Sequence, residues 1–347
     1  VVALHEHTNT PALQPYTDGS YTSLRTGAVC FSPKGDAWMT NSLSDNGLVV
    51  WRRDGTWQAF YTRDMVGTTE VDKILYDTVN DLVWFAGRAN RLYVADAEGH
   101  LAWVNPNQGS KLETSSVTCM AQDHDGTLWI GTNKGLKIIS SAYRAFANGG
   151  QGELAPINCS NITISNNEFA EYLMAYESIT CIAVDGANRK WVGTSQGGLY
   201  LISANGQEEL LHFTPSNSPL YSNKIVCLGV QPYTGEVFIG TPAGTQSYRA
   251  TATYAGSHAQ DEIAVFPNPV EPGYEGPIAV RGFSRNAIVH ISDAAGHVVF
   301  SGKADGGQVV WNGRTLQGQR AASGVYFVFA SDDQGKNRAV GKILLVR

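Results

Sequence analysis

The chain has 347 residues, of which 43% are hydrophobic and 16% charged, and its net charge is −6. This composition is typical of a globular protein with two or more domains, and no apolar run is long enough to cross a membrane as a helix. The acidic balance argues against a dedicated nucleic-acid binder, which needs a basic face to neutralise phosphates. Because the chain starts at Val1, without methionine or a signal peptide, we expect it to be the C-terminal part of a longer protein.

Five related segments follow one another from the N-terminus, and each carries an aromatic residue close to a turn rich in glycine or asparagine. They read "GDAWMTNSLSDNGLVVW" from Gly35, "NDLVWFAGRANRLYV" from Asn80, "DGTLWIGTNKGL" from Asp125, "NRKWVGTSQGGLYLI" from Asn188 and "GEVFIGTPAGTQSY" from Gly235. Apolar stretches between such turns predict short strands. The aromatic recurs at Trp38, Trp84, Trp129, Trp191 and Phe238, with three intervals in the mid-forties and one long interval. This period predicts an all-β fold of four-stranded β-propeller blades.

The predicted propeller occupies residues 1–249. We place the blades near residues 26–62, 71–105, 116–147, 178–213 and 223–249, with an inserted hairpin over 144–177 that explains the long interval. The fifth copy lacks a clear fourth strand, and "VVALHEHTNTP" at the N-terminus resembles the fourth strand and exit loop "ELLHFTPSNSP". Either the five copies close through Val1–Thr8, or they are the end of a larger propeller. The start at Val1 favours the second reading.

Four cysteines occupy the same position in the first strand of four blades: Cys30, Cys119, Cys181 and Cys227. Metal ligation and disulfides are the functional readings of such residues. Recurrence in separate blades without a Cys-x-x-Cys pair favours small buried hydrophobes instead. We therefore expect reduced, buried and unlinked thiols.

The sequence contains no His-Glu-x-x-His motif, no Gly-x-Ser-x-Gly elbow and no phosphate loop. We therefore predict no catalytic residue, no metal and no cofactor, although a non-standard hydrolytic site on a loop stays open.

Candidate ligand contacts lie in the loops between the second and third strands of the blades. Arg88 and Arg91 replace the small or polar residues of the other copies, and guanidinium groups bind phosphate or carboxylate bidentately. The alternative is that they pair with neighbouring acidic residues. Tyr172 and Tyr176 of the insertion are expected over the same face, where they would stack on sugar or pack against their own blade.

From residue 250 the repeat gives way to a small, polar linker over 250–262. The strand-like segments that follow predict an Ig-like β-sandwich of about seven strands over 263–347. From Asp261 onward there are 9 basic and 8 acidic residues, so the acidic surplus belongs to the propeller.

Three segments of this tail carry a family resemblance: "VFPNPV" at 265–270, "VVWNGRTLQGQRAASGVYFV" at 309–328 and "KILLVR" at 342–347. They resemble the C-terminal sorting domain of type IX secretion, on which the motif residues are Pro267, Asn268, Pro269, Gly324, Tyr326 and Lys342. "LWIGT" and "TPSNSPLYSNKIVCLGV" resemble propellers of the two-component-regulator type. The combination is similar to the propeller subunits of the type IX surface attachment complex.

The resemblance implies a non-enzymatic protein that is exported through the periplasm and stays at the cell surface on the outer membrane. Its implied partners are a surface sortase, other attachment-complex proteins and anionic lipopolysaccharide. The alternative is a secreted carbohydrate-binding or hydrolytic propeller whose C-terminal domain is a cleavable sorting signal. A ligand-sensing domain of a hybrid kinase is disfavoured, because the tail resembles a sorting domain and not a membrane helix.

Overall fold

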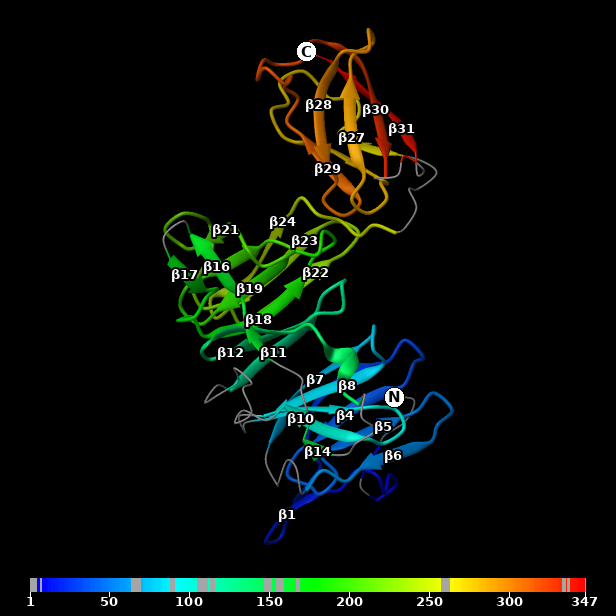
Figure 1. Ribbon diagram of the computed structural model, residues 1–347, viewed down its shortest axis with the longest axis vertical. Coiled ribbons are helices and arrows are strands. Elements are labelled where there is room, and N and C mark those ends of the chain that lie inside the picture. Colours follow the sequence, from blue (N-terminus) through cyan, green and yellow to red (C-terminus); the bar gives the residue numbers. More distant parts are fainter. Residues whose placement is uncertain are drawn as a thin grey trace. The chain divides into compact units, whose positions relative to one another are not determined.

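The computed structural model is all-β (Figure 1), and its one described helix is the single 3₁₀ turn η1 (Ala142–Arg144). It describes the chain except for residues 1–4, 7, 64–69, 88–90, 105–111, 113–115, 147–151, 154–158, 167–168, 257–262, 333–334, 336–337 and 347. No helix among the described residues has the length and apolar character needed to cross a membrane.

Two compact units make up the chain. The first consists of Val1–Ile182, Val192–Tyr200 and Gly206–Cys227. The second consists of Ala183–Trp191, Leu201–Asn205 and Leu228–Arg347. The last propeller sheet therefore belongs to the same unit as the C-terminal sandwich.

The repeats form antiparallel sheets of sequential strands, as expected for propeller blades. The first sheet is β3 (Thr26–Phe31), β4 (Ala37–Asn41), β5 (Leu48–Trp51) and β6 (Trp57–Phe60). The second is β7 (Val71–Asp77), β8 (Leu82–Gly87), β9 (Leu92–Ala95) and β10 (Leu101–Val104). The third begins with β11 (Val117–Gln122), β12 (Leu128–Thr132) and β13 (Gly135–Ile139). The fourth is β18 (Ile179–Val184), β19 (Lys190–Thr194), β20 (Leu199–Ile202) and β21 (Glu209–Phe213), and the fifth is β22 (Cys227–Gln231), β23 (Glu236–Thr241) and β24 (Gly244–Arg249).

The insertion adds strands to two of these sheets and forms a hairpin of its own. β14 (Gly152–Glu153) pairs in parallel with β10, and β15 (Ser160–Asn161) is the fourth strand of the third sheet. β16 (Thr163–Asn166) and β17 (Phe169–Tyr172) pair with each other. A further hairpin, β1 (Tyr16–Asp18) and β2 (Tyr21–Ser23), precedes the first sheet.

Four of the five repeated aromatics are buried between sheets. Trp38, Trp84, Trp129 and Trp191 are 0–3% exposed. Trp38 packs with Phe85 of the second sheet, and Trp84 belongs to a core with Ile130 of the third. The fifth copy differs, because Phe238 is 45% exposed. The fifth sheet has three strands among the described residues. The expected closure through Val1–Thr8 falls largely on residues outside those described.

All five cysteines are free, but none of the four repeated ones is fully buried, contrary to expectation. Cys30, Cys119 and Cys181 are half-buried, whereas Cys227 is exposed. Cys227 starts β22, which pairs with β23, the strand on which Phe238 is exposed.

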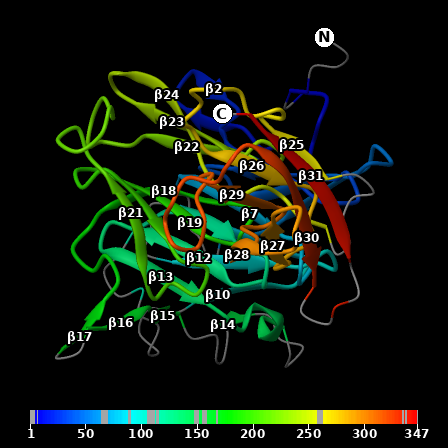
Figure 2. The same ribbon diagram turned by 90° about the horizontal axis from the view of Figure 1, so that it is seen from above.

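Seven strands in two sheets form the C-terminal sandwich, which is consistent with the predicted Ig-like architecture. One sheet has the order β25 (Ala264–Phe266), β26 (Ile278–Arg281), β29 (Gln308–Trp311). The other has the order β28 (Val298–Lys303), β27 (Ile288–Ser292), β30 (Gly324–Ser331), β31 (Ala339–Leu345). Figure 2 shows β30 and β31 running alongside each other at the end of the chain. The core between the sheets includes Trp311, Val328 and Ile343, each completely buried.

Residues 250–256 of the predicted linker are built into the second unit. Ala252, Thr253 and Ala255 are at most 4% exposed, and the Thr253 carbonyl accepts a 2.9 Å hydrogen bond from the Gly307 N–H. A side chain at Gly186 would overlap the Thr253 backbone, so the segment lies directly on the turn before β19.

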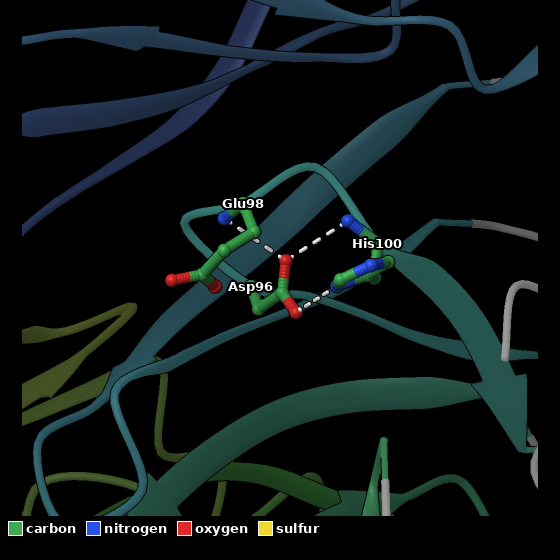
Figure 3. Close-up of side chains that lie close together, drawn as sticks. All are labelled: Asp96, Glu98 and His100. Carbon is green, nitrogen blue, oxygen red and sulfur yellow. Dashed lines mark hydrogen bonds and ion pairs between the residues drawn. The ribbon is translucent and has the colours of Figure 1, made fainter. Parts of the chain in front are cut away.

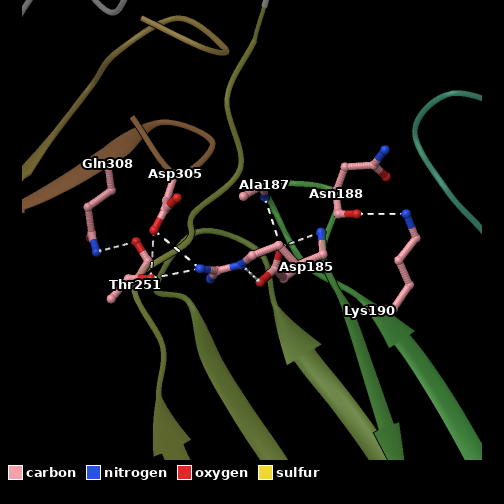
Figure 4. Close-up of polar contacts among 8 residues, drawn as sticks. Asp185, Ala187, Asn188, Lys190, Thr251, Asp305 and Gln308 are labelled. Atoms are coloured by element: carbon pink, nitrogen blue, oxygen red, sulfur yellow. Dashed lines mark hydrogen bonds and ion pairs between the residues drawn. The ribbon is translucent and has the colours of Figure 1, made fainter. Parts of the chain in front are cut away.

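The charged cluster beside this segment is shown in Figure 4. Arg189 donates from Nε to Asp185 Oδ2 at 2.8 Å and from Nη1 to Thr251 Oγ1 at 3.0 Å. The same Nη1 lies 3.2 Å from Asp305 Oδ2 in the sandwich. The Arg189 guanidinium therefore connects the turn before β19, the segment 250–256 and the sandwich, all within the second unit.

Candidate functional site

The insertion lies against two loops of the propeller. The Gly135 N–H, at the start of β13, donates a 2.8 Å hydrogen bond to the Glu177 carbonyl. A Cβ at Gly197, in the β19–β20 loop, would come within 2.7 Å of the Glu177 carboxylate oxygens. Both glycines therefore permit the close approach of the turn that follows β17.

A cleft of about 460 Å³ opens beside this turn. Its lining includes three carboxylates and three tyrosines: Glu171, Tyr172, Tyr176, Glu177, Tyr200 and Glu209. They come from β17, from the turn after it, and from β20 and β21 of the fourth sheet. The volume lies within the range of small-ligand sites.

Tyr200 is the buried aromatic of the cleft, with 9% of its surface exposed. Its ring stacks on His212 with 3.9 Å between centroids, and His212 Nε2 lies 2.6 Å from the Gly197 carbonyl. Burial, with the nearby carboxylates of Glu177 and Glu209, raises the pKa of Tyr200 to about 12. The hydroxyl therefore stays protonated at neutral pH.

Tyr172 and Tyr176, the two tyrosines predicted as ligand contacts, both line this cleft. They are 53% and 102% exposed. The geometry leaves both rings available for stacking.

The two predicted arginines are placed differently. Arg88 lies outside the described residues. Arg91 is exposed, and its guanidinium lies 5.9 Å from the centre of the Trp103 ring. Since Arg91 does not line the cleft, the structure does not bring it together with Tyr172 and Tyr176.

Asp96, Glu98 and His100 form a cluster whose ligand atoms lie within 4.8 Å of one another, close enough to hold a metal ion (Figure 3). The Asp96 carboxylate is already engaged. Oδ1 accepts hydrogen bonds from the N–H groups of Glu98, Gly99 and His100, and Oδ2 lies 2.6 Å from His100 Nδ1.

The same turn recurs elsewhere in the chain. Asp123, Asp185 and Asp293 each accept from the N–H groups two and four residues later. Asp293 also contacts His297 Nδ1, at 3.0 Å. We therefore assign the Asp96 cluster to turn stabilisation, in which the carboxylate satisfies backbone donors.

The motif residues of the tail gather around the last strand. The Asn268 side chain donates to the Lys342 carbonyl at 3.1 Å and accepts from the Leu344 N–H at 2.9 Å. Its neighbours Pro267 and Pro269 both follow cis peptide bonds. Asn268 therefore pairs with β31 in place of a backbone partner.

The remaining motif residues lie on the neighbouring strand or on β31 itself. Gly324 is opposite Leu345 in the β30–β31 register, and Tyr326 is opposite Ile343. Tyr326 is 5% exposed, and its hydroxyl donates to the Ala322 carbonyl at 2.8 Å. The Lys342 ammonium lies 6.0 Å from the centre of the Phe327 ring.

Sequence reasoning missed the acidic residues of the cleft and Tyr200. Glu171 and Glu177 flank the two tyrosines in "EYLMAYE". This local pattern could have indicated that carboxylates lie beside the tyrosines. Tyr200 occupies the third-strand position that Lys137 has in the preceding copy. No local signal connects Glu209 with the insertion, because their proximity depends on the fold.

Comparison with known proteins identifies the architecture. Residues 111–134 match the family model of the two component regulator propeller. The solved structure of PorZ from Porphyromonas gingivalis, described as an essential surface component of the type IX secretion system, is 25% identical with a TM-score of 0.67. The chain is similar to PorZ along its whole length. The match covers 100% of this chain and 48% of PorZ, so the chain spans about half the length of that relative.

A second solved structure is an extracellular domain ascribed to a hybrid two-component system of B. thetaiotaomicron. It is 11% identical, the match covers 95% of this chain and 56% of that one, and the TM-score is 0.44. No curated protein matches the chain.

Proposed function

We propose that this chain belongs to a non-enzymatic surface component of a type IX secretion system. The observation that carries the proposal is the similarity to PorZ, which covers 100% of the chain at 25% identity. A match of propeller repeats alone would end before residue 250, whereas this one includes the sandwich.

In this proposal the protein crosses the periplasm and stays at the outer membrane surface, where it supports sortase-mediated anchoring of cargo. Residues 263–347 act as a type IX sorting domain, and a surface sortase and other attachment-complex proteins are its partners. The pairing of Asn268 with β31 supports this reading, because it joins the "PNP" motif to the terminal strand within one folded element.

Deletion of the gene in its native bacterium tests the proposal. Proteins that carry the same kind of sorting domain should then fail to become anchored at the surface, and the full-length gene should restore them. Normal surface anchoring of such cargo in the deletion strain would contradict the role.

Intact mass of the native protein separates the proposed component from a secreted cargo. Retention of Arg347 is expected for a resident component, whereas a cut within 250–262 would identify a cargo with a cleavable signal. Burial of Ala252, Thr253 and Ala255 favours retention, since a protease needs an exposed, extended backbone.

Anionic lipopolysaccharide is the ligand proposed for Arg88 and Arg91. A hydrogen bond to a charged group contributes about 1.5–3 kcal/mol, so Arg88→Ala/Arg91→Ala should weaken lipopolysaccharide binding about tenfold or more. Lys34→Ala/Arg53→Ala removes the same charge elsewhere and should leave binding nearly unchanged. Equal affinities for the two double variants would assign Arg88 and Arg91 to other contacts.

A further inference from the structure

We infer that the cleft beside the insertion binds a cationic group, the ammonium or guanidinium of a lysine or arginine side chain on a protein partner. The inference goes beyond the proposed function and is independent of it, because it rests on the lining of one cleft in the first unit.

The first argument is charge. Glu171, Glu177 and Glu209 line the cleft, and its lining among the described residues contains no lysine, arginine or histidine. None of these three carboxylates has an ion-pair partner within the part of the chain that the structure describes. A cleft with like charges on low-dielectric walls concentrates its field and attracts counter-charges. A bound cation would relieve the repulsion among the carboxylates.

The second argument is the aromatic surface. Tyr172 and Tyr176 are exposed beside the carboxylates, so their ring faces are accessible to a ligand. A cation over a tyrosine face is attracted by the ring quadrupole, and guanidinium groups also stack on it. Tyr200 lies in the same lining, and its stacking on His212 keeps that ring fixed. Aromatic faces combined with carboxylates recognise the charge and the flat shape of a guanidinium together.

The same chemistry argues against two other ligands. An anionic glycan would be repelled by three carboxylates. A neutral sugar could stack on the tyrosines, but its hydroxyls would leave the charge of the carboxylates uncompensated. Electrostatic complementarity therefore favours a basic side chain.

Met174 provides a reporter for the test, because it lines the cleft and the chain has 4 methionines. The experiment follows ¹³C-methyl methionine NMR spectra of the whole chain, with Met174 assigned through Met174→Leu. The probe is the peptide acetyl-Gly-Arg-Gly-amide. Its matched control contains citrulline, which has nearly the shape of arginine without the charge.

The arginine peptide should shift the Met174 signal in a saturable manner, and the citrulline peptide should not. Glu171→Gln/Glu209→Gln should weaken binding about tenfold or more, since charge-assisted contacts are lost. Tyr176→Ala should also weaken binding of the arginine peptide. Because that ring is fully exposed, its removal should leave the fold intact. Glu208→Gln removes one charge next to Glu209 but outside the lining, and it should bind as the native chain does.

Three results would overturn the inference. The first is the absence of a saturable change in the Met174 methyl signal when the arginine peptide is titrated. The second is equal affinity for the arginine and citrulline peptides. The third is a Met174 shift with cellotriose that persists unchanged in Glu171→Gln/Glu209→Gln, which would make the cleft a neutral-sugar site.

Discussion

At the scale of single residues, the glycine of the repeated Trp-x-Gly motif makes room for a cysteine thiol. A Cβ at Gly193 would lie 2.6 Å from Cys181 Sγ, and one at Gly131 would overlap Cys119 Sγ in the same way. Burial raises the pKa of Cys119 to about 12 and that of Cys181 to about 11. Since the thiolate is the reactive form, these cysteines are packing residues and not nucleophiles.

Cys227 should behave differently from the other thiols because it is exposed. In native buffer at pH 8, a thiol reagent such as DTNB should label one cysteine per chain rapidly, and the other four only after denaturation. Cys227→Ser should abolish the rapid phase. Rapid labelling of Cys119 or Cys181 in the native protein would contradict the packing described here.

At the scale of one element, the terminal strand β31 is integral to the sandwich. It pairs with β30 along its whole length and with Asn268 on its other side. Its side chains alternate, so Ile343 and Leu345 are 0% and 1% exposed while Leu344 is 43% exposed. This alternation is the expected pattern of a strand with one face in the core.

Ile343→Ala should therefore destabilise the sandwich by about 2–5 kcal/mol, through lost apolar burial and the cavity left behind. Leu344→Ala, on the exposed face of the same strand, should cost far less. Urea denaturation of the two variants measures the difference in unfolding free energy. Similar losses for both would show that β31 does not pack as described.

At the scale of the whole molecule, Arg189 connects the turn before β19 to residue Thr251 and to the sandwich within the second unit. Asp185, its partner in the turn before β19, is 1% exposed. Removing one member of a buried ion pair leaves the other charge uncompensated, which typically costs about 3–5 kcal/mol. The fixed fork of the guanidinium is needed to reach Asp185, Thr251 and Asp305 together.

Arg189→Ala should lower the thermal unfolding midpoint of the second unit and expose residues 250–256 to limited proteolysis. Arg189→Lys should restore only part of the loss, because an ammonium lacks the forked geometry. Arg249→Ala is the control, since its pair with Glu236 is long at 3.7 Å and exposed, and such pairs contribute little. Equal midpoints for Arg189→Ala and the native chain would contradict a structural role of the cluster.

Much of the fold could be predicted from local pattern. An aromatic residue and its flanking turns repeat along the chain, at Trp38, Trp84, Trp129 and Trp191. Strand formation depends on such short-range signals. The site could be predicted only in part. Tyr172 and Tyr176 were named as candidate ligand contacts and line the cleft, whereas Arg91, expected over the same face, does not line it.

The sequence by itself therefore determined the all-β architecture, the propeller repeats and the strands of the sandwich, because periodicity and turn residues act over a few neighbours. Tertiary structure alone decided which side chains share the cleft, since Glu171 and Glu209 meet only when the insertion lies against the fourth sheet. It also decided the exposure of Cys227 and Phe238, whose counterparts at the same repeat positions are less exposed. The burial of a strand residue depends on which other elements cover that face of the sheet, and this cannot be read from the sequence of the strand itself.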